Sequence, residues 1–465
     1  MIEFLIAIAV TAIAATLIVK KYQPHTVLLL AGLALFVATA IFFPSQDVVF
    51  RKSDPTGWIG FDIFEHIHGI MSYRLAGLGL IIMAAGGFAK YMDHIGATNA
   101  MVNICTRPLA FVGAPYVVLA LGYAVGQALN IFIPSAAGLA MLLLVTLYPM
   151  LVRLGVSKAA AAAMIGTTSV LDLGPASGTA NLAASTANID VALFFAQYQI
   201  PLAAFIIPTI CILTYFSAKY FDARDGHTVL ASSIDTGMGD PDSDGETRTA
   251  PGFYALLPIL PLTLILIFSK LFIDHIEIGV VTAMVIGALL GLFLEMIRCR
   301  HDMRAVFKGF MVFFKGMGNM FSGIISLIIC AEFFAAGLKA IGAISFMITT
   351  AENAGFGIVG MMFVACILVA VTAVMTGSGN AAFFSFANLA PQITANSTAG
   401  AVSLLLPLQF TAGIARSLSP VSGVIIAVAE VAGCSPIDIV KRTAIPLIGA
   451  LIVLFTYNVL FLTAA

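Results

Sequence analysis

Two short polar motifs interrupt otherwise apolar stretches of this sequence. LDLGPASG covers Leu171 to Gly178 and RSLSPVSG covers Arg416 to Gly423, with proline, serine and glycine at the same spacing in both. Proline removes a backbone hydrogen bond from a helix, and neighbouring glycine lowers the cost of unwinding it. A broken helix exposes carbonyl oxygens, which bind cations, and a new N-terminus, which binds carboxylates. Each motif is therefore a candidate binding site for an anion. Ordinary proline kinks are the alternative interpretation, and the occurrence of two matched breaks favours a site.

Two ionisable side chains lie close to these prolines. Asp172 precedes Pro175 by three residues, and Arg416 precedes Pro420 by four. Because a lone charge at the bilayer centre costs roughly 2.5 kcal/mol or more, both should face the protein interior. We expect Arg416 to pair with a substrate carboxylate, and Asp172 to be its resting partner or a proton carrier. A permanent Asp172–Arg416 salt bridge is the structural alternative. Orienting hydrogen bonds are expected from Ser177, Thr179, Asn181, Ser417, Ser419 and Ser422.

Two further pairs of segments match between the halves of the chain. Asn130, Ser135, Leu139 and Ala140 recur as Asn380, Ser385, Leu389 and Ala390, and the segment that ends at Ala97 aligns with the one that ends at Ala343. The asparagines lie in polar tips between short hydrophobic arms. We predict re-entrant hairpins over about 109–150 and 357–397, because non-helical backbone at membrane depth is tolerated only inside protein or beside a wet cavity. Glu332, in the last of these segments, is a second proton-coupling candidate or a scaffold contact.

Composition indicates an all-α polytopic membrane protein. Hydrophobic residues make up 60% of the chain and charged residues 10%. The six cysteines have no metal-binding spacing, and we expect no metal, no cofactor and no nucleic-acid partner. Runs of about 20 apolar residues can cross a bilayer core of about 30 Å. The expected spans are 2–19, 25–43, 74–90, 157–185, 193–217, 253–272, 277–297, 309–338, 400–431 and 441–463.

The spans divide into two inverted repeats. Each half has five crossings, one re-entrant hairpin and one discontinuous helix, over about 157–185 and 400–431. An odd number of crossings inverts the second repeat, and this topology puts fifteen basic residues in cytoplasmic loops against five outside. Counting the hairpins as full spans would give parallel repeats and scatter the basic loops. Both termini are then external, and the hairpins open to opposite sides.

The expected domains are a first repeat over 1–218, an acidic linker over 219–251 and a second repeat over 252–465. The linker has seven acidic residues between Asp222 and Ala250 and is predicted to be cytoplasmic and disordered. A calcium-binding loop is a weak alternative, because the twelve-residue pattern is missing. Residues 44–73 are expected to form an amphipathic stretch at the membrane surface.

These motifs resemble the ion transporter superfamily of dicarboxylate and citrate carriers. TGSGNAAFFSFANLAP, from Thr376, and ARSLSPVSGVIIA, from Ala415, are similar to the anaerobic C4-dicarboxylate carriers of the DcuC type. The resemblance implies a homodimer that moves its hairpin-bearing domain across the membrane, elevator fashion. It also implies a substrate cradle made of Asn130, Ser135, Ser177, Gly178, Thr179, Ser378, Gly379, Asn380, Ser419, Pro420 and Ser422. Sodium-coupled relatives have Ser-Asn-Thr at both tips, whereas this chain has Leu-Asn-Ile and Gly-Asn-Ala, which favours protons or exchange over Na⁺.

The expected function is secondary active transport of C4-dicarboxylates such as succinate, fumarate and malate, by symport or antiport, across a bacterial cytoplasmic membrane. Two equivalent half-sites suit a short diacid, because each can bind one carboxylate. The alternative is a related carrier for a monocarboxylate, citrate or an amino-acid conjugate, with or without Na⁺ coupling. A channel or a membrane-embedded hydrolase is disfavoured. The spans contain no HExxH, paired-Asp or GxSxG site, so we expect no enzyme.

Overall fold

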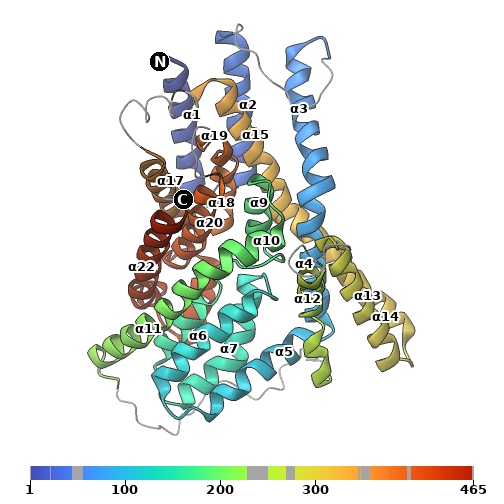
Figure 1. Cartoon of the computed structure of the whole chain (residues 1–465), viewed down its shortest axis with the longest axis vertical. Coiled ribbons are helices and arrows are strands. Elements are labelled where there is room, and N and C mark those ends of the chain that lie inside the picture. Colours follow the sequence, from blue (N-terminus) through green and yellow to red (C-terminus); the bar gives the residue numbers. More distant parts are fainter. Residues whose placement is uncertain are drawn as a thin grey trace.

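A computed structural model describes residues 2–20, 22–43, 56–227, 250–268, 278–343, 346, 357–394 and 400–462. Every regular element in these residues is helical (Figure 1). The first half contains α1 (Ile2–Val19), α2 (Pro24–Phe42), α3 (Ile59–Arg74), η1 (Leu75–Gly79), α4 (Leu80–His94), α5 (Ala97–Thr106), η2 (Arg107–Phe111), α6 (Pro115–Asn130), α7 (Ala136–Arg153), α8 (Lys158–Thr167), α9 (Gly178–Thr186), α10 (Val191–Phe194), η3 (Phe195–Gln199) and α11 (Ile200–Arg224).

The second half repeats much of this order. It contains η4 (Gly252–Leu256), α12 (Leu260–Ile267), α13 (Val280–Arg298), α14 (Met303–Met320), η5 (Phe321–Ile325), α15 (Ser326–Ala340), α17 (Ile358–Thr376), α18 (Gly379–Ala387), α19 (Ala390–Ile393), α20 (Val402–Ser417), α21 (Gly423–Ala432) and α22 (Pro436–Phe461). The π-helical turns η1 and η5 join α3 to α4 and α14 to α15. The helices α3–α4 and α14–α15, each with a π-helical turn in its middle, thus occupy matching places in the two halves.

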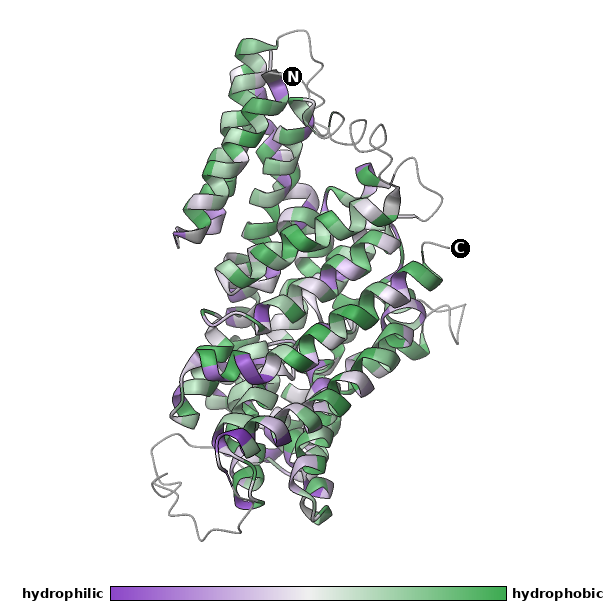
Figure 2. Cartoon of the chain, turned by 90° about the vertical axis from the view of Figure 1, so that its left-hand side faces the viewer, coloured by the Kyte–Doolittle hydropathy of each residue, from purple (hydrophilic) through white to green (hydrophobic). Residues whose placement is uncertain are grey.

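The described residues include eight helical segments long and apolar enough to cross a membrane, which confirms a polytopic helical protein. Hydrophobic residues extend along most of their length (Figure 2). The eight segments include α7 and α17, which the sequence assigns to hairpins. They leave out α1, and they also leave out α8, α9, α20 and α21, which have 9 to 16 residues each. The span expected at 253–272 is described only as far as residue 268.

Two predicted boundaries are wrong. The linker expected over 219–251 begins later, because α11 continues to Arg224 and its Asp222 is fully buried. The span expected at 74–90 begins too late. Residues 59–73, expected at the membrane surface, belong to one continuous helical segment, Ile59–His94, of 36 residues. At 1.5 Å per residue this segment is about 54 Å long, well beyond the bilayer core. The polar residues that suggested a surface stretch include His66, which is buried against Phe36 and Phe333. Residues 44–55, and the linker between 228 and 249, lie outside the described residues.

Each predicted break is present. Between α8 and α9 the backbone is not helical, and Ser177 caps α9 by accepting a hydrogen bond from Ala180 N. Between α20 and α21 the helix ends at Ser417 and begins again at Gly423. Proline-containing motifs with glycine have therefore opened both helices at the positions that the sequence indicates.

Each helical hairpin packs its tip on the break of its own half. The first consists of α6 and α7, and the second of α17 followed by α18 and α19. Gly174 and Gly377 have positive φ angles of 85° and 70°, which favour glycine. A Cβ atom on Gly377 would lie 2.7 Å from the Val421 oxygen, and one on Gly174 would lie 3.0 Å from the Ile131 side chain. The first hairpin lies in the lower half of Figure 1 and the second in the upper half.

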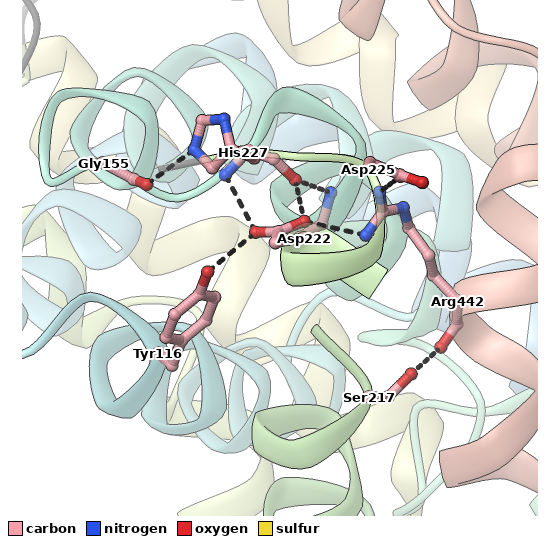
Figure 3. A network of polar contacts seen from close by, with 9 residues as sticks. Tyr116, Gly155, Ser217, Asp222, Asp225, His227 and Arg442 are labelled. Atoms are coloured by element: carbon pink, nitrogen blue, oxygen red, sulfur yellow. Dashed lines mark hydrogen bonds and ion pairs between the residues drawn. The ribbon is translucent and has the colours of Figure 1, made fainter. Parts of the chain in front are cut away.

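A buried polar network ties the first hairpin and the first broken helix to α11 and α22 (Figure 3). The fully buried Asp222, on α11, accepts hydrogen bonds from Ser157 Oγ at 2.6 Å and Tyr116 Oη at 3.1 Å. Arg442, on α22, donates to the same carboxylate at 2.8 Å and forms an ion pair with Asp225. Because each partner compensates a buried charge, the network holds the elements that carry the first break together.

Candidate functional site

The first break is held open by side-chain amides. Gln127 Nε2, from α6, donates to the Leu171 oxygen at 2.6 Å, and Asn130 Nδ2 donates to the same oxygen at 3.0 Å. Gln127 Oε1 also accepts from Leu171 N at 3.3 Å. These bonds replace the backbone partners that an unbroken helix would supply, and in an apolar interior an unpaired backbone group is costly.

Two more glutamines continue this support. Gln199 Oε1, from η3, accepts from Gly174 N at 2.9 Å, and Gln409 Nε2, from α20, donates to the Asp172 oxygen at 2.8 Å. Gln199 Nε2 donates to Gln409 Oε1 at 3.1 Å, which joins the two halves of the chain. The backbone from Leu171 to Gly174 is therefore fixed by residues from three separate elements.

Sequence reasoning missed all three glutamines. Gln127, Gln199 and Gln409 are fully or almost fully buried, and each lies in an apolar helix. The available signal was the presence of an amide in an apolar span, where such a side chain needs a partner on another helix. We expected Asn130 to bind substrate, but its Nδ2 atom contacts the break instead.

A cavity of about 420 Å³ lies beside the first break. Such a volume suits a small ligand. One part of its wall is formed by α4 and the end of α14, and includes Gly86, Lys90, Asp93 and Asn319. Of the predicted site residues, those that line it are Ser135, Asp172, Ser177, Gly178, Thr179, Asn380 and Arg416. The structure thus brings together the site residues predicted in the first half of the chain, except Asn130, with Asn380 and Arg416 from the second half.

Arg416 lines the same cavity as the residues of the first break. Its Nη2 atom donates to the Ser169 oxygen at 2.5 Å and to Ser169 Oγ at 3.1 Å. Its Nε atom is buried and has no hydrogen-bond partner within the described residues. A guanidinium bound only to a neutral residue keeps donors for an anion.

Asp172 forms no direct ion pair with Arg416 in the part of the chain that the structure describes. The permanent salt bridge considered as an alternative is therefore absent from this structure. An acidic and a basic side chain instead face the same cavity separately.

The remaining predicted site residues do not line this cavity. Ser419 is buried and donates to the Val374 oxygen at 2.6 Å, and Ser378 caps α18 by accepting from Ala381 N. Gly379 packs against the Ala412 backbone. Pro420 and Ser422 lie at the second break, which is covered by the tip of its own hairpin. Glu332 forms an ion pair with Arg74 beside a different cavity.

Comparison with known proteins adds to this geometry. Residues 2–463 match the family model described as C4-dicarboxylate anaerobic carrier, DcuC. The chain is 34% identical over 454 residues to the anaerobic C4-dicarboxylate transporter DcuC of Escherichia coli strain K12, covering 97% of this chain and 95% of the relative. It is 32% identical over 452 residues to the probable anaerobic C4-dicarboxylate transporter DcuC of Vibrio cholerae, covering 97% and 96%.

Two solved structures have a similar fold. The YdaH transporter of Alcanivorax borkumensis superposes with a TM-score of 0.61 at 16% identity, covering 95% of this chain and 99% of that one. MtrF of Neisseria gonorrhoeae, described as a member of a class of antimetabolite efflux pumps, superposes with a TM-score of 0.63 at 13% identity. The match covers 94% of this chain and 95% of that one. At these identities the likeness supports the fold alone.

Proposed function

The chain belongs to the DcuC family of C4-dicarboxylate anaerobic carriers, and from that premise we propose that it is a secondary active transporter of succinate, fumarate and malate. The family and its named relatives are transporters and not enzymes. The proposed location is the bacterial cytoplasmic membrane, and the proposed assembly is a homodimer.

The observation that carries this proposal is the cavity between Arg416 and the N-terminus of α9. One substrate carboxylate would accept hydrogen bonds from Arg416 and from Asn380, both of which line the cavity. The other would face Ser177, Gly178 and Thr179, where unpaired N–H groups and the helix dipole favour an anion. A diacid therefore satisfies both ends of the cavity, whereas a monoacid would leave one end without a charge partner.

We propose that the fold is a pair of inverted repeats, each with five crossings and one re-entrant hairpin. Support comes from the matched order of π-turn, hairpin and broken helix in the two halves. In this arrangement the first hairpin opens to the cytoplasm, so the cavity beside Ser135 faces inward. Transport then requires the hairpin-bearing domain to move against α4 and α14, elevator fashion.

The proposed coupling is to protons or to a counter-substrate, with Asp172 and Glu332 as proton-carrying candidates. Asp172 faces the proposed substrate cavity, which supports its role. The hairpin tips at Asn130 and Asn380 carry no flanking hydroxyls for Na⁺. Citrate, a monocarboxylate or an amino-acid conjugate, with Na⁺ coupling, is the alternative.

Labelled-succinate counterflow by the purified protein in liposomes tests the function. We expect counterflow with C4-diacids, and its loss in both Arg416→Ala and Asn380→Ala. Ser385→Ala is the matched control, because its hydroxyl only returns to its own helix at Ala381 O and does not line the cavity. Conductance without counterflow would indicate a channel, and wild-type kinetics in both variants would refute the site. Varying Na⁺, pH and the number of substrate carboxylates separates the alternatives.

A further inference from the structure

A second cavity, of about 480 Å³, lies between α3, α15 and the end of the second hairpin. Its polar wall includes Arg74, Glu332, Lys339, Asn388 and Gln392. The helices α3 and α15 lie in the upper half of Figure 1, whereas α7, which contributes to the first cavity, lies in the lower half. No residue lines both cavities.

The two cavities are built from corresponding positions of the repeat. The alignment that ends at Ala97 and Ala343 pairs α4 with α15 at one constant offset. At that offset, four wall residues of the first cavity match four of the second: Gly86 with Glu332, Ala89 with Ala335, Lys90 with Ala336, and Asp93 with Lys339. Asn319 and Met320 of the first cavity likewise match Tyr73 and Arg74 of the second. The second cavity is thus the counterpart of the first on the opposite side.

The charges of the second cavity suit an anion with two carboxylates. Arg74 is buried, pairs with Glu332, and donates from Nη2 to Asn388 Oδ1 at 3.2 Å. Asn388 Nδ2 is buried without a hydrogen-bond partner among the described residues, so it remains an available donor. Lys339 adds an exposed cation at the cavity wall. Glu332 already forms an ion pair with the Arg74 guanidinium, to which an incoming carboxylate would bind.

We propose that this second cavity is the access site for the dicarboxylate on the side opposite to the first cavity. One substrate carboxylate replaces Glu332 at Arg74 and accepts a hydrogen bond from Asn388 Nδ2, while the other faces Lys339. Glu332 is then a competitor that neutralises Arg74 while the site is empty. This inference rests on the proposed function, because it takes the transported diacid as the ligand.

This competition predicts opposite changes in the KM for succinate in two variants. In Glu332→Gln, Arg74 loses its charged partner, so the apparent KM for succinate added from the second-cavity side should fall several-fold. In the double variant Arg74→Gln/Glu332→Gln, the KM from that side should rise about tenfold or more, as expected for loss of a charge-assisted hydrogen bond. The double variant removes both charges of the Arg74–Glu332 pair, so it tests the site even if a single arginine replacement fails to fold. Ser326→Ala, which lines neither cavity and whose hydroxyl only donates to the Ser322 backbone oxygen, should leave both values unchanged.

The measurement is succinate exchange in right-side-out and inside-out vesicles that contain the full-length protein. The inference requires that the KM from the first-cavity side stays at the wild-type value in both variants. Equal changes from both sides, or a higher KM in Glu332→Gln from the second-cavity side, would contradict the inference. The Arg74–Glu332 pair would then serve the fold or the coupling and not substrate access. Absence of succinate transport by the wild type would instead refute the proposed function, so the two failures are distinct.

Discussion

At the scale of single residues, the geometry of the site depends on buried amides more than on prolines. Pro175 opens the helix, but Gln127, Gln199 and Gln409 determine which way the freed backbone lies. Their bonds hold Leu171 to Gly174 in one conformation, which places the Asp172 side chain at the cavity wall. The backbone beside the proposed substrate cavity is therefore held in place before any substrate binds.

Gln409→Leu should damage both stability and binding. The substitution removes hydrogen bonds to the Asp172 backbone oxygen and to Thr179 Oγ1, and it leaves that backbone oxygen only the longer bond of 3.4 Å from Gln199 Nε2. Loss of hydrogen bonds by buried polar groups costs about 1–3 kcal/mol. We expect a lower unfolding temperature in detergent and a raised KM for succinate. Gln23→Leu, at an exposed position, is the control and should change neither. A Gln409→Leu protein with wild-type melting and wild-type KM would show that the amide is dispensable.

The charged residues at the cavity could be predicted from the sequence, but the glutamines that hold the backbone beside it could not. Asp172 and Arg416 were predicted from their distance to the prolines, and both line the cavity. The glutamines come from positions far apart in the chain, with no common spacing, and only the folded structure brings them together. For the same reason the sequence placed Ser419 and Ser422 at the site, although their hairpin covers them.

At the scale of helices, the two halves meet where α20 crosses the first break. Gly413 is the closest point, since a Cβ atom there would lie 2.2 Å from the Val170 oxygen. Ser417 Oγ and Arg416 Nη2 donate to the backbone oxygens of Gly166 and Ser169 along the same contact. The position of Arg416 at the cavity depends on this close approach.

Gly413→Ala should therefore separate α20 from the break. Because the added methyl group meets a backbone atom that cannot rotate away, we expect a loss of about 1–3 kcal/mol and weaker succinate transport. Gly423→Ala is the matched control, since a Cβ atom there has no neighbour within 4 Å. Thermal unfolding and counterflow of the two variants provide the comparison. Equal behaviour of the two alanine variants would contradict the proposed contact.

Most helices could be predicted from the sequence, since apolar length and proline motifs are local signals. Both breaks lie where the motifs indicated, and α1 and α2 match their expected bounds closely. The α3–α4 helix was predicted to begin too late, because hydropathy cannot tell a polar residue in water from one buried between helices. His66 and Arg74 are of the second kind.

At the scale of the whole molecule, the proposed inverted repeat determines the side of the membrane to which each hairpin opens. Arg153 and Gly357 lie at the open ends of the first and second hairpins, and both are exposed. In a cysteine-free background, a membrane-impermeant maleimide should label Gly357→Cys in intact cells and Arg153→Cys only after permeabilisation. Labelling of both from one side would mean that the hairpins open to the same face and that the repeats are parallel.

The central claim is that a dicarboxylate occupies the cavity between Arg416 and the α9 N-terminus. Ser135 lines this cavity and is exposed, so a single cysteine there reports on occupancy. The most direct measurement is the rate at which a thiol reagent modifies Ser135→Cys in the purified, otherwise cysteine-free protein. The account predicts that succinate slows modification, that butyrate does not, and that Arg416→Ala abolishes the protection. A modification rate that succinate leaves unchanged, in protein that still catalyses counterflow, would contradict it.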